Sequence, residues 1–274
     1  MSESPVFLFD NSDPEMQAAY ERARATFRYF WREMSWERRR IIPGLTLAAV
    51  KAPFSDGPDA PRDDDNPGVE HMWINEVDFD GKVVSGTLLN QPNWIKSVNA
   101  GDEVHVPLAH ISDWMYGIGE DVYGAHSVNL LRSRMNPRER KEHDAAWGLN
   151  FGDPNKVRIV PVEKKSGGFL KSLFGGKSNE AADGPIGEHP MSINMAEVLP
   201  EQLAENPEFL NSTDDRGWTV LHVEALAGSA PTVKVLLEHG ADRNAKTADG
   251  RTPLQLAQSL GWEDVVALLS KKKA

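Results

Sequence analysis

The stretch Gly217-Trp218-Thr219-Val220-Leu221-His222 returns 33 residues later as Gly250-Arg251-Thr252-Pro253-Leu254-Gln255. The same offset places Gly228 on Gly261, and it places apolar residues of the two copies on one another. A fixed period of this length is typical of a solenoid, in which each repeat cannot bury its apolar face alone. The sequence therefore predicts stacked helix pairs over residues 192–270.

The repeated segment resembles the ankyrin family. The period is 33 residues, Thr252-Pro253-Leu254 follows the Thr-Pro-Leu-His signature, and the run Val235–Ala245 reads VLLEHGADRNA. The sequence departs from the family pattern at Val220, Glu224 and Gln255, which weakens the consensus packing without breaking the period. In this resemblance His222 is a structural hydrogen-bonding residue rather than a catalytic or metal-binding group.

The repeat array is short. Residues 195–211 read as a degenerate half-repeat that precedes two full repeats, whereas a solenoid usually needs about three repeats to be stable. We therefore expect the array to pack on the rest of the chain or on a second copy of it.

Composition excludes several classes of protein. The chain has 274 residues, a net charge of −11 and no cysteine. The lack of cysteine excludes a disulfide scaffold, an iron–sulfur cluster, a thiolate zinc site and a cysteine nucleophile. The acidic charge disfavours nucleic-acid binding. No apolar stretch approaches the 18 residues of a membrane span, and the N-terminus lacks the pattern of a secretory signal. We expect a cytoplasmic protein.

The chain divides into three parts by composition. We predict an α+β domain over residues 1–162, a flexible linker rich in Gly, Ser and Lys over residues 163–190, and an all-α ankyrin array over residues 191–274. The linker contains Phe169-Leu170-Lys171-Ser172-Leu173-Phe174. We favour a sticky patch that folds back on a neighbouring domain over a membrane-touching or partner-docking motif.

The first domain alternates a long helical pattern with short strands. Residues 14–40 follow helical spacing, with Asp13 as a cap. Strands are expected at residues 45–54, 71–79, 82–89, 101–108 and 111–116, and two short helices at 128–135 and 137–146. Asp80-Gly81 is a hairpin turn signal. We predict a small, curled antiparallel sheet with a long N-terminal helix.

This domain resembles a bacterial family known as domain of unknown function 2314. The resemblance covers roughly residues 26–162 and rests on five short segments: Glu70-His71-Met72-Trp73, Gly86-Thr87-Leu88-Leu89-Asn90, Gly101-Asp102, Ile111-Ser112-Asp113-Trp114 and Gly148-Leu149-Asn150-Phe151-Gly152-Asp153-Pro154. The family also occurs joined to ankyrin repeats. Since it has no firmly assigned activity, the resemblance implies a fold but no reaction.

Signatures of catalysis are weak in this domain. It has no nucleophile elbow, phosphate loop, dinucleotide fingerprint or His-Glu-x-x-His spacing, so we predict neither a metal nor a cofactor. The best catalytic candidates are Glu70, His71, Asp113 and His126, because a carboxylate beside an imidazole can form an acid/base pair. We favour the alternative that they make local hydrogen bonds, and the sequence favours a protein without catalytic activity.

A protein-binding function is the leading hypothesis. The ankyrin resemblance implies a scaffold or regulator, including an immunity-type protein that binds and neutralises another protein. The alternatives are an uncharacterised hydrolase or small-ligand-binding domain targeted by its ankyrin arm, and self-association through the array. The resemblance places the partner surface at turn tips and exposed first-helix positions: Asp215, Arg216, Trp218, Leu226, Ala227, Ala248, Asp249, Arg251, Ser259 and Leu260.

Overall fold

The computed structural model describes residues 13–58, 68–161 and 186–271. Most of the predicted linker, residues 163–185, lies outside these ranges, and so does its segment Phe169–Phe174. Residues 1–12, 59–67 and 272–274 lie outside them as well. None of the described helices is both long enough and apolar enough to cross a lipid bilayer.

The long N-terminal helix is confirmed. Helix α1 spans Pro14–Glu37, and the carboxylate of Asp13 caps it by accepting hydrogen bonds from the backbone N–H groups of Glu15 and Met16. It ends three residues before the predicted end at Arg40, because the carboxylate of Glu37 binds the backbone N–H groups of the loop that follows. The helix buries residues on several sides, so it must be covered by more than one neighbour.

The sheet is antiparallel throughout and has six strands in the order β4-β3-β2-β1-β5-β6. The last strand, β6, was not predicted from the sequence, because it is only four residues long. A bulge between Asn75 and Asp78 interrupts the pairing of two central strands, with Glu76 at a positive φ of 50°. The bounds are β1 Leu47–Phe54, β2 Glu70–Phe79, β3 Val83–Leu88, β4 Glu103–Pro107, β5 Asp113–Ile118 and β6 Asp121–Gly124.

Short helices complete the α+β domain. The 3-10 turn η1 spans Leu108–His110, α2 spans His126–Arg134 and α3 spans Pro137–Trp147. Helix α3 begins with a complete capping box between Asn136 and Glu139, and it ends at Gly148 in the left-handed conformation. These caps explain why the predicted boundaries of α3 are nearly correct.

The ankyrin array is confirmed as stacked helices. Thr219 and Thr252 start the first helices of the two full repeats, as their positions in the repeat predict. The predicted turn tips also form, since Gly217 donates to the carbonyl of Asp214 and Gly250 to that of Thr247. The helices are α4 Pro190–Glu205, the 3-10 turn η2 Pro207–Leu210, α5 Val220–Ala227, α6 Ala230–Glu238, α7 Pro253–Ser259 and α8 Glu263–Ser270.

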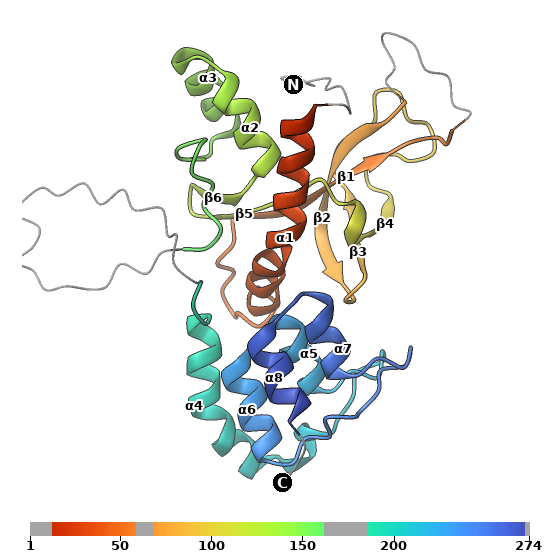
Figure 1. Cartoon of the computed structure of the whole chain (residues 1–274), viewed down its shortest axis with the longest axis vertical. Helices are drawn as coiled ribbons and strands as arrows, with labels where there is room; N and C mark the ends of the chain where they lie inside the picture. The colour runs from red at the N-terminus through yellow and green to blue at the C-terminus, as the bar shows by residue number, and fades with distance from the viewer. Residues whose placement is uncertain (1–12, 59–67, 162–185, 272–274) are drawn as a thin grey trace, which may run out of the picture.

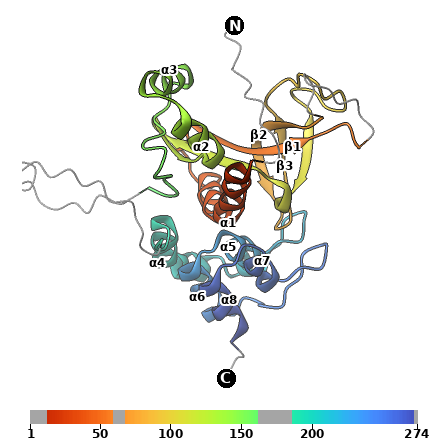
Figure 2. The same ribbon diagram turned by 45° about the horizontal axis from the view of Figure 1, so that its top comes forward.

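The array packs on the N-terminal domain, as the shortness of the array led us to expect. Figure 1 shows the last turns of α1 against the helices of the array, and Figure 2 shows α1 between the sheet and the array. Phe27, Phe30 and Trp31 of α1 form ring contacts with Trp114 or Phe79 of the sheet. Its other side, described below, faces the array. Helix α1 is thus the shared core of both parts.

Candidate functional site

A buried ion pair links α1 to the array. Nη1 of Arg39, just after α1, lies 2.6 Å from Oε1 of Glu224 in α5. Glu224 is only 3% exposed, and its other oxygen accepts a hydrogen bond from Thr232. The guanidinium also lies over the ring of Trp36, 4.3 Å from the ring centroid. A carboxylate removed from water in this way needs its cationic partner.

Trp262 forms an aromatic contact at the same interface. Its ring meets that of Tyr29 edge-on at a centroid distance of 5.8 Å, and the guanidinium groups of Arg28 and Arg32 lie over it. Arg28 also donates to the carbonyl of Gly261 at 3.0 Å. Both arginines therefore present charge to the array while their stems cover apolar surface.

The turn between β2 and β3 forms the second area of contact. Asp78 binds Arg38 at 2.7 Å and Arg216 of the array at 3.1 Å. Burial acts to raise the pKa of Asp78, but the charges of the two arginines outweigh it and hold that pKa below its usual value. Arg251 binds both the carbonyl and the carboxylate of Asp80. Array turn tips thus contact this hairpin.

The first residues of the array are fixed to α1 as well. Nε2 of His189 lies 3.1 Å from Oε2 of Glu33, and its ring stacks on Trp36 at a centroid distance of 5.7 Å. Arg40 binds the other oxygen of Glu33 at 3.0 Å. Burial would raise the pKa of Glu33, but His189 and Arg40 together lower it.

The predicted partner surface is only partly free. Trp218, Leu226, Ala227 and Leu260 are buried, at 8% exposure or less, so the expectation that they lie on an open surface is wrong. Stacking explains this, because first-helix positions face either a neighbouring helix or α1. Arg216 and Arg251 bind the hairpin described above. The exposed members of the set are Asp215, Arg216, Ala248, Asp249 and Ser259, and of these Arg216 is engaged with the hairpin.

Glu70, the first catalytic candidate, anchors a loop. Its carboxylate accepts hydrogen bonds from the backbone N–H groups of Asn93, Trp94 and Ile95 at 2.8–3.0 Å and from the side chain of Asn93. Burial acts to raise the pKa of Glu70, but these hydrogen bonds lower it overall. With both oxygens engaged, Glu70 has the environment of a structural carboxylate.

His71, the second candidate, pairs with a serine. Its Nδ1 lies 2.9 Å from Oγ of Ser112, and its ring stacks on Tyr20 at a centroid distance of 5.1 Å. Burial, assisted by the charge of Lys51, lowers the pKa of His71 to about 4. The serine is 1% exposed and donates to the carbonyl of Lys51. A Ser–His contact this enclosed offers a substrate no access in the described structure.

The last two candidates meet at the start of α2. Asp113 is fully buried, and its carboxylate accepts hydrogen bonds from the backbone N–H groups of His126 and Ser127 and from the hydroxyl of Ser127. It thereby holds α2 against β5, where Ala125 adopts a left-handed conformation with φ 57°. The structure brings Asp113 and His126 together, whereas His71 pairs with the neighbouring Ser112 and Glu70 binds the loop at residues 93–95.

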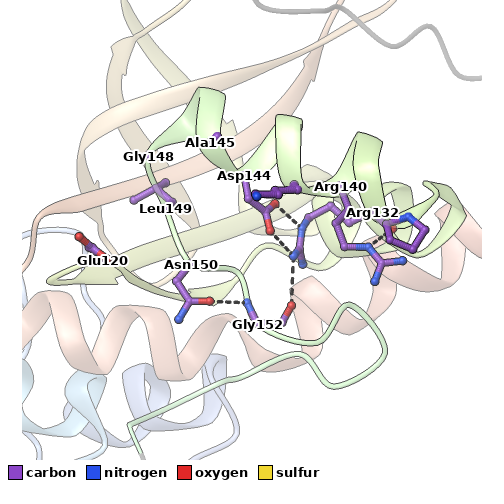
Figure 3. A pocket seen from close by; sticks show the side chains of 11 residues that line it. Glu120, Arg132, Arg140, Asp144, Ala145, Gly148, Leu149, Asn150 and Gly152 are labelled. Carbon is purple, nitrogen blue, oxygen red and sulfur yellow. Dashed lines mark hydrogen bonds and ion pairs between the residues drawn. The ribbon is translucent and has the colours of Figure 1, made fainter.

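A cavity of about 620 Å³ lies beside α3. Figure 3 shows the side chain of Arg132 pointing into its wall, where it binds both oxygens of Asp144 and the carbonyl of Gly152. Its guanidinium also lies over the ring of Phe151, 5.1 Å from the ring centroid. Because the guanidinium of Arg132 and the carboxylate of Asp144 form hydrogen bonds with each other, we interpret them as a structural contact that holds α2, α3 and the following loop together.

A second cavity, of about 460 Å³, lies among α1, α2 and residues 154–159. Sequence reasoning singled out one of its lining residues, His126, but had no signal for the cavity, because its walls come from three separate segments. The lining residues are Arg22, Thr26, His126, Leu130, Ser133, Pro154, Asn155, Val157 and Ile159.

A metal or cofactor has no evident site among the residues that the structure places. In that part of the chain no three or more His, Asp or Glu side chains lie together in a way that could hold a metal ion. His105 of β4 and His110 of η1 are both exposed. The expectation of no metal and no cofactor therefore stays a prediction.

The fold defines an α+β domain joined to an ankyrin array, the type of repeat that serves in protein–protein interaction. The chain belongs to the family described as uncharacterized protein conserved in bacteria (DUF2314), whose model matches residues 13–151. A model of ankyrin repeats in three copies matches residues 191–274. Both assignments confirm the resemblances drawn from the sequence.

Relatives share either the whole chain or one of its parts. A Neisseria meningitidis protein named as an ankyrin repeat protein is 40% identical over 273 residues, which is 99% of each chain. The uncharacterized Escherichia coli protein YegJ is 31% identical over 83 residues, 30% of this chain and 48% of that protein. One chain of a solved complex between a predatory endopeptidase and an immunity protein from Bdellovibrio bacteriovorus aligns with 54% of this chain. The alignment covers 63% of that chain at 19% identity. Its TM-score of 0.27 is too low to indicate a shared fold.

Proposed function

We infer that the chain is a cytoplasmic protein-binding scaffold or regulator whose exposed turn tips contact a basic partner. The observation that carries this proposal is that the array is fixed to the N-terminal domain while Asp215, Ala248 and Asp249 remain exposed. A surface held in one conformation loses less entropy when it binds, and so it binds more tightly.

Charge supports the choice of partner. The chain has a net charge of −11, and the exposed tips carry Asp215 and Asp249. Opposite charge on a partner would speed association and disfavour acidic competitors. An immunity-type role, in which the chain binds and neutralises another protein, is the specific form of this function that we favour. It needs a pre-organised surface of this kind.

Affinity purification of the intact protein from its native cells tests the proposal. We expect the wild type to recover a partner at near-stoichiometric ratio, and the double variant Asp215→Arg with Ala248→Arg to recover at least about ten times less. The matched control, Glu201→Arg with Ala204→Arg, makes the same changes at exposed positions of α4. Equal recovery by all three proteins, or recovery of none, would overturn the proposal.

A further inference from the structure

We propose that the second cavity binds a small organic monocarboxylate with an apolar body. This cavity lies in the N-terminal domain, away from the turn tips of the array, so the proposal is independent of the protein-binding function. Its volume of about 460 Å³ falls within the range of about 300–1,000 Å³ typical of small-molecule sites.

Arg22 supplies the anchor for the acid group. Among the described residues it is the one permanently cationic side chain that lines the cavity, and it lies exposed on α1. Within the described ranges its guanidinium has no hydrogen bond or ion pair, whereas Arg24 donates to the carbonyl of Ile111 and Arg28 to that of Gly261. A planar guanidinium with free donors matches a carboxylate through two parallel hydrogen bonds.

His126 sets the charge of the cavity. Its Nε2 lies 2.9 Å from Oγ1 of Thr26, and that hydroxyl donates to the carbonyl of Arg22 at 2.6 Å. When the hydroxyl donates to that carbonyl, it accepts from Nε2, and Nε2 then carries the proton of the neutral ring. Burial lowers the pKa of His126; the charge of Asp113 opposes this effect and that of Arg22 assists it, so that the ring is neutral at pH 7.

With the imidazole neutral, Arg22 is the one charged side chain among the described residues that line the cavity. A monoanion balances that charge, whereas a phosphate dianion would bring an unpaired negative charge into a partly enclosed space. The Nδ1 atom of His126 is buried and has no hydrogen-bond partner among the described residues. It is an acceptor, which makes this side of the cavity unfavourable for a second acidic group.

Apolar side chains form the rest of the wall. Leu130 of α2 and Pro154, Val157 and Ile159 of the following segment line the cavity, and Pro154 is buried. A ligand that removes this surface from water is stabilised in proportion to the apolar area that it buries. We therefore expect a preference for a medium-chain acid such as octanoate over acetate.

Calorimetric titration of the full-length protein with octanoate tests the proposal. We expect saturable one-to-one binding, at least about tenfold weaker binding of acetate and of the neutral analogue 1-octanol, and at least about tenfold weaker octanoate binding by Arg22→Gln. The matched control Arg138→Gln removes another exposed arginine, whose side chain is 88% exposed, and should bind octanoate as the wild type does.

A cavity-filling variant separates this site from non-specific apolar binding. Leu130→Trp should abolish octanoate binding, with circular dichroism confirming that the fold is retained. Arg22→Gln alters an exposed side chain, so it keeps the test valid if the tryptophan variant does not fold. The proposal is overturned if octanoate shows no saturable binding, if Arg22→Gln binds it as tightly as the wild type, or if 1-octanol binds as tightly as octanoate.

Discussion

Arg39 lies 2.6 Å from Glu224, and this contact joins positions 185 residues apart in the chain. Glu224 is buried, so the charge of Arg39 is needed wherever the array is docked. The pair makes docking specific, since apolar packing alone would tolerate a shifted register.

Replacing Arg39 by alanine should leave the carboxylate of Glu224 buried without its cation. We expect Arg39→Ala to lower the free energy of unfolding by about 2–4 kcal/mol, measured by urea denaturation. Arg138→Ala, which breaks an exposed ion pair with Glu142, should change it by less than about 1 kcal/mol. Equal effects of the two substitutions would show that Glu224 does not depend on Arg39.

Two glycines of the array allow a matched test of the contact with Trp262. Gly228 and Gly240 both have positive φ, 73° and 93°, so alanine at either should cost about 1–2 kcal/mol. A Cβ at Gly228 would overlap the indole ring of Trp262, whereas one at Gly240 meets nothing within 4 Å. Thermal denaturation should therefore show Gly228→Ala as the less stable variant by a further 1–3 kcal/mol. Similar melting temperatures would contradict this.

Leu236 tests the packing between repeats. Its side chain is fully buried in the array core, and Leu236→Ala should lower the free energy of unfolding by about 2–5 kcal/mol. Lys234→Ala on the exposed side of the same helix is the control and should have little effect. Chemical denaturation followed by far-ultraviolet circular dichroism measures both, and a loss below about 1 kcal/mol for Leu236→Ala would argue against the stacked core.

Stability should fall as the pH falls from 6.5 towards 4. The pKa of His71 is about 4 in the folded chain and about 6.5 in an unfolded one, so the unfolded chain binds more protons in this window. The contribution of His71 is fully present above pH 6.5. We expect His71→Asn to reduce the loss of stability between pH 7 and pH 5 by about 2 kcal/mol. Urea midpoints at the two pH values measure it, and parallel curves for both proteins would refute it.

The double variant Trp218→Ala with Arg251→Ala separates a structural from a partner-binding role of these residues. The sequence predicts that it weakens partner binding at least roughly a hundredfold with helical content unchanged. Because Trp218 is 6% exposed and Arg251 binds Asp80, the structure instead leads us to expect a lower melting temperature with partner binding retained. If the melting temperature falls while a recovered partner stays bound, the residues serve only the internal interface.

Local signals made most of the fold predictable. The 33-residue period, the cap at Asp13 and the turn at Asp80-Gly81 each depend on residues close in the sequence, and the structure confirms all three predictions. Strand β6 was missed because four residues are too few for a period to show. The bulge at Glu76 was missed because it depends on how two strands pair across space.

The candidate sites were harder to predict, since burial depends on contacts between distant segments. The resemblance to ankyrin repeats identified positions that partners can use, but it could not show that α1 covers some of them. Arg28, Arg32 and Arg39 share one side of the helical pattern, which could have indicated a second covered face. The second cavity left no trace in the sequence, because Arg22 and Val157 meet only in the folded chain.

The position of α1 between sheet and array has a consequence for biosynthesis. Residues 14–37 leave the ribosome first, but the helices that cover their outer side begin at residue 190. At a translation rate of about 5–20 residues per second, the indole of Trp36 and the ring of Tyr29 remain without the array helices for on the order of ten seconds or more. During that interval the nascent chain presents an arginine- and aromatic-rich helix face that a chaperone could hold until translation ends.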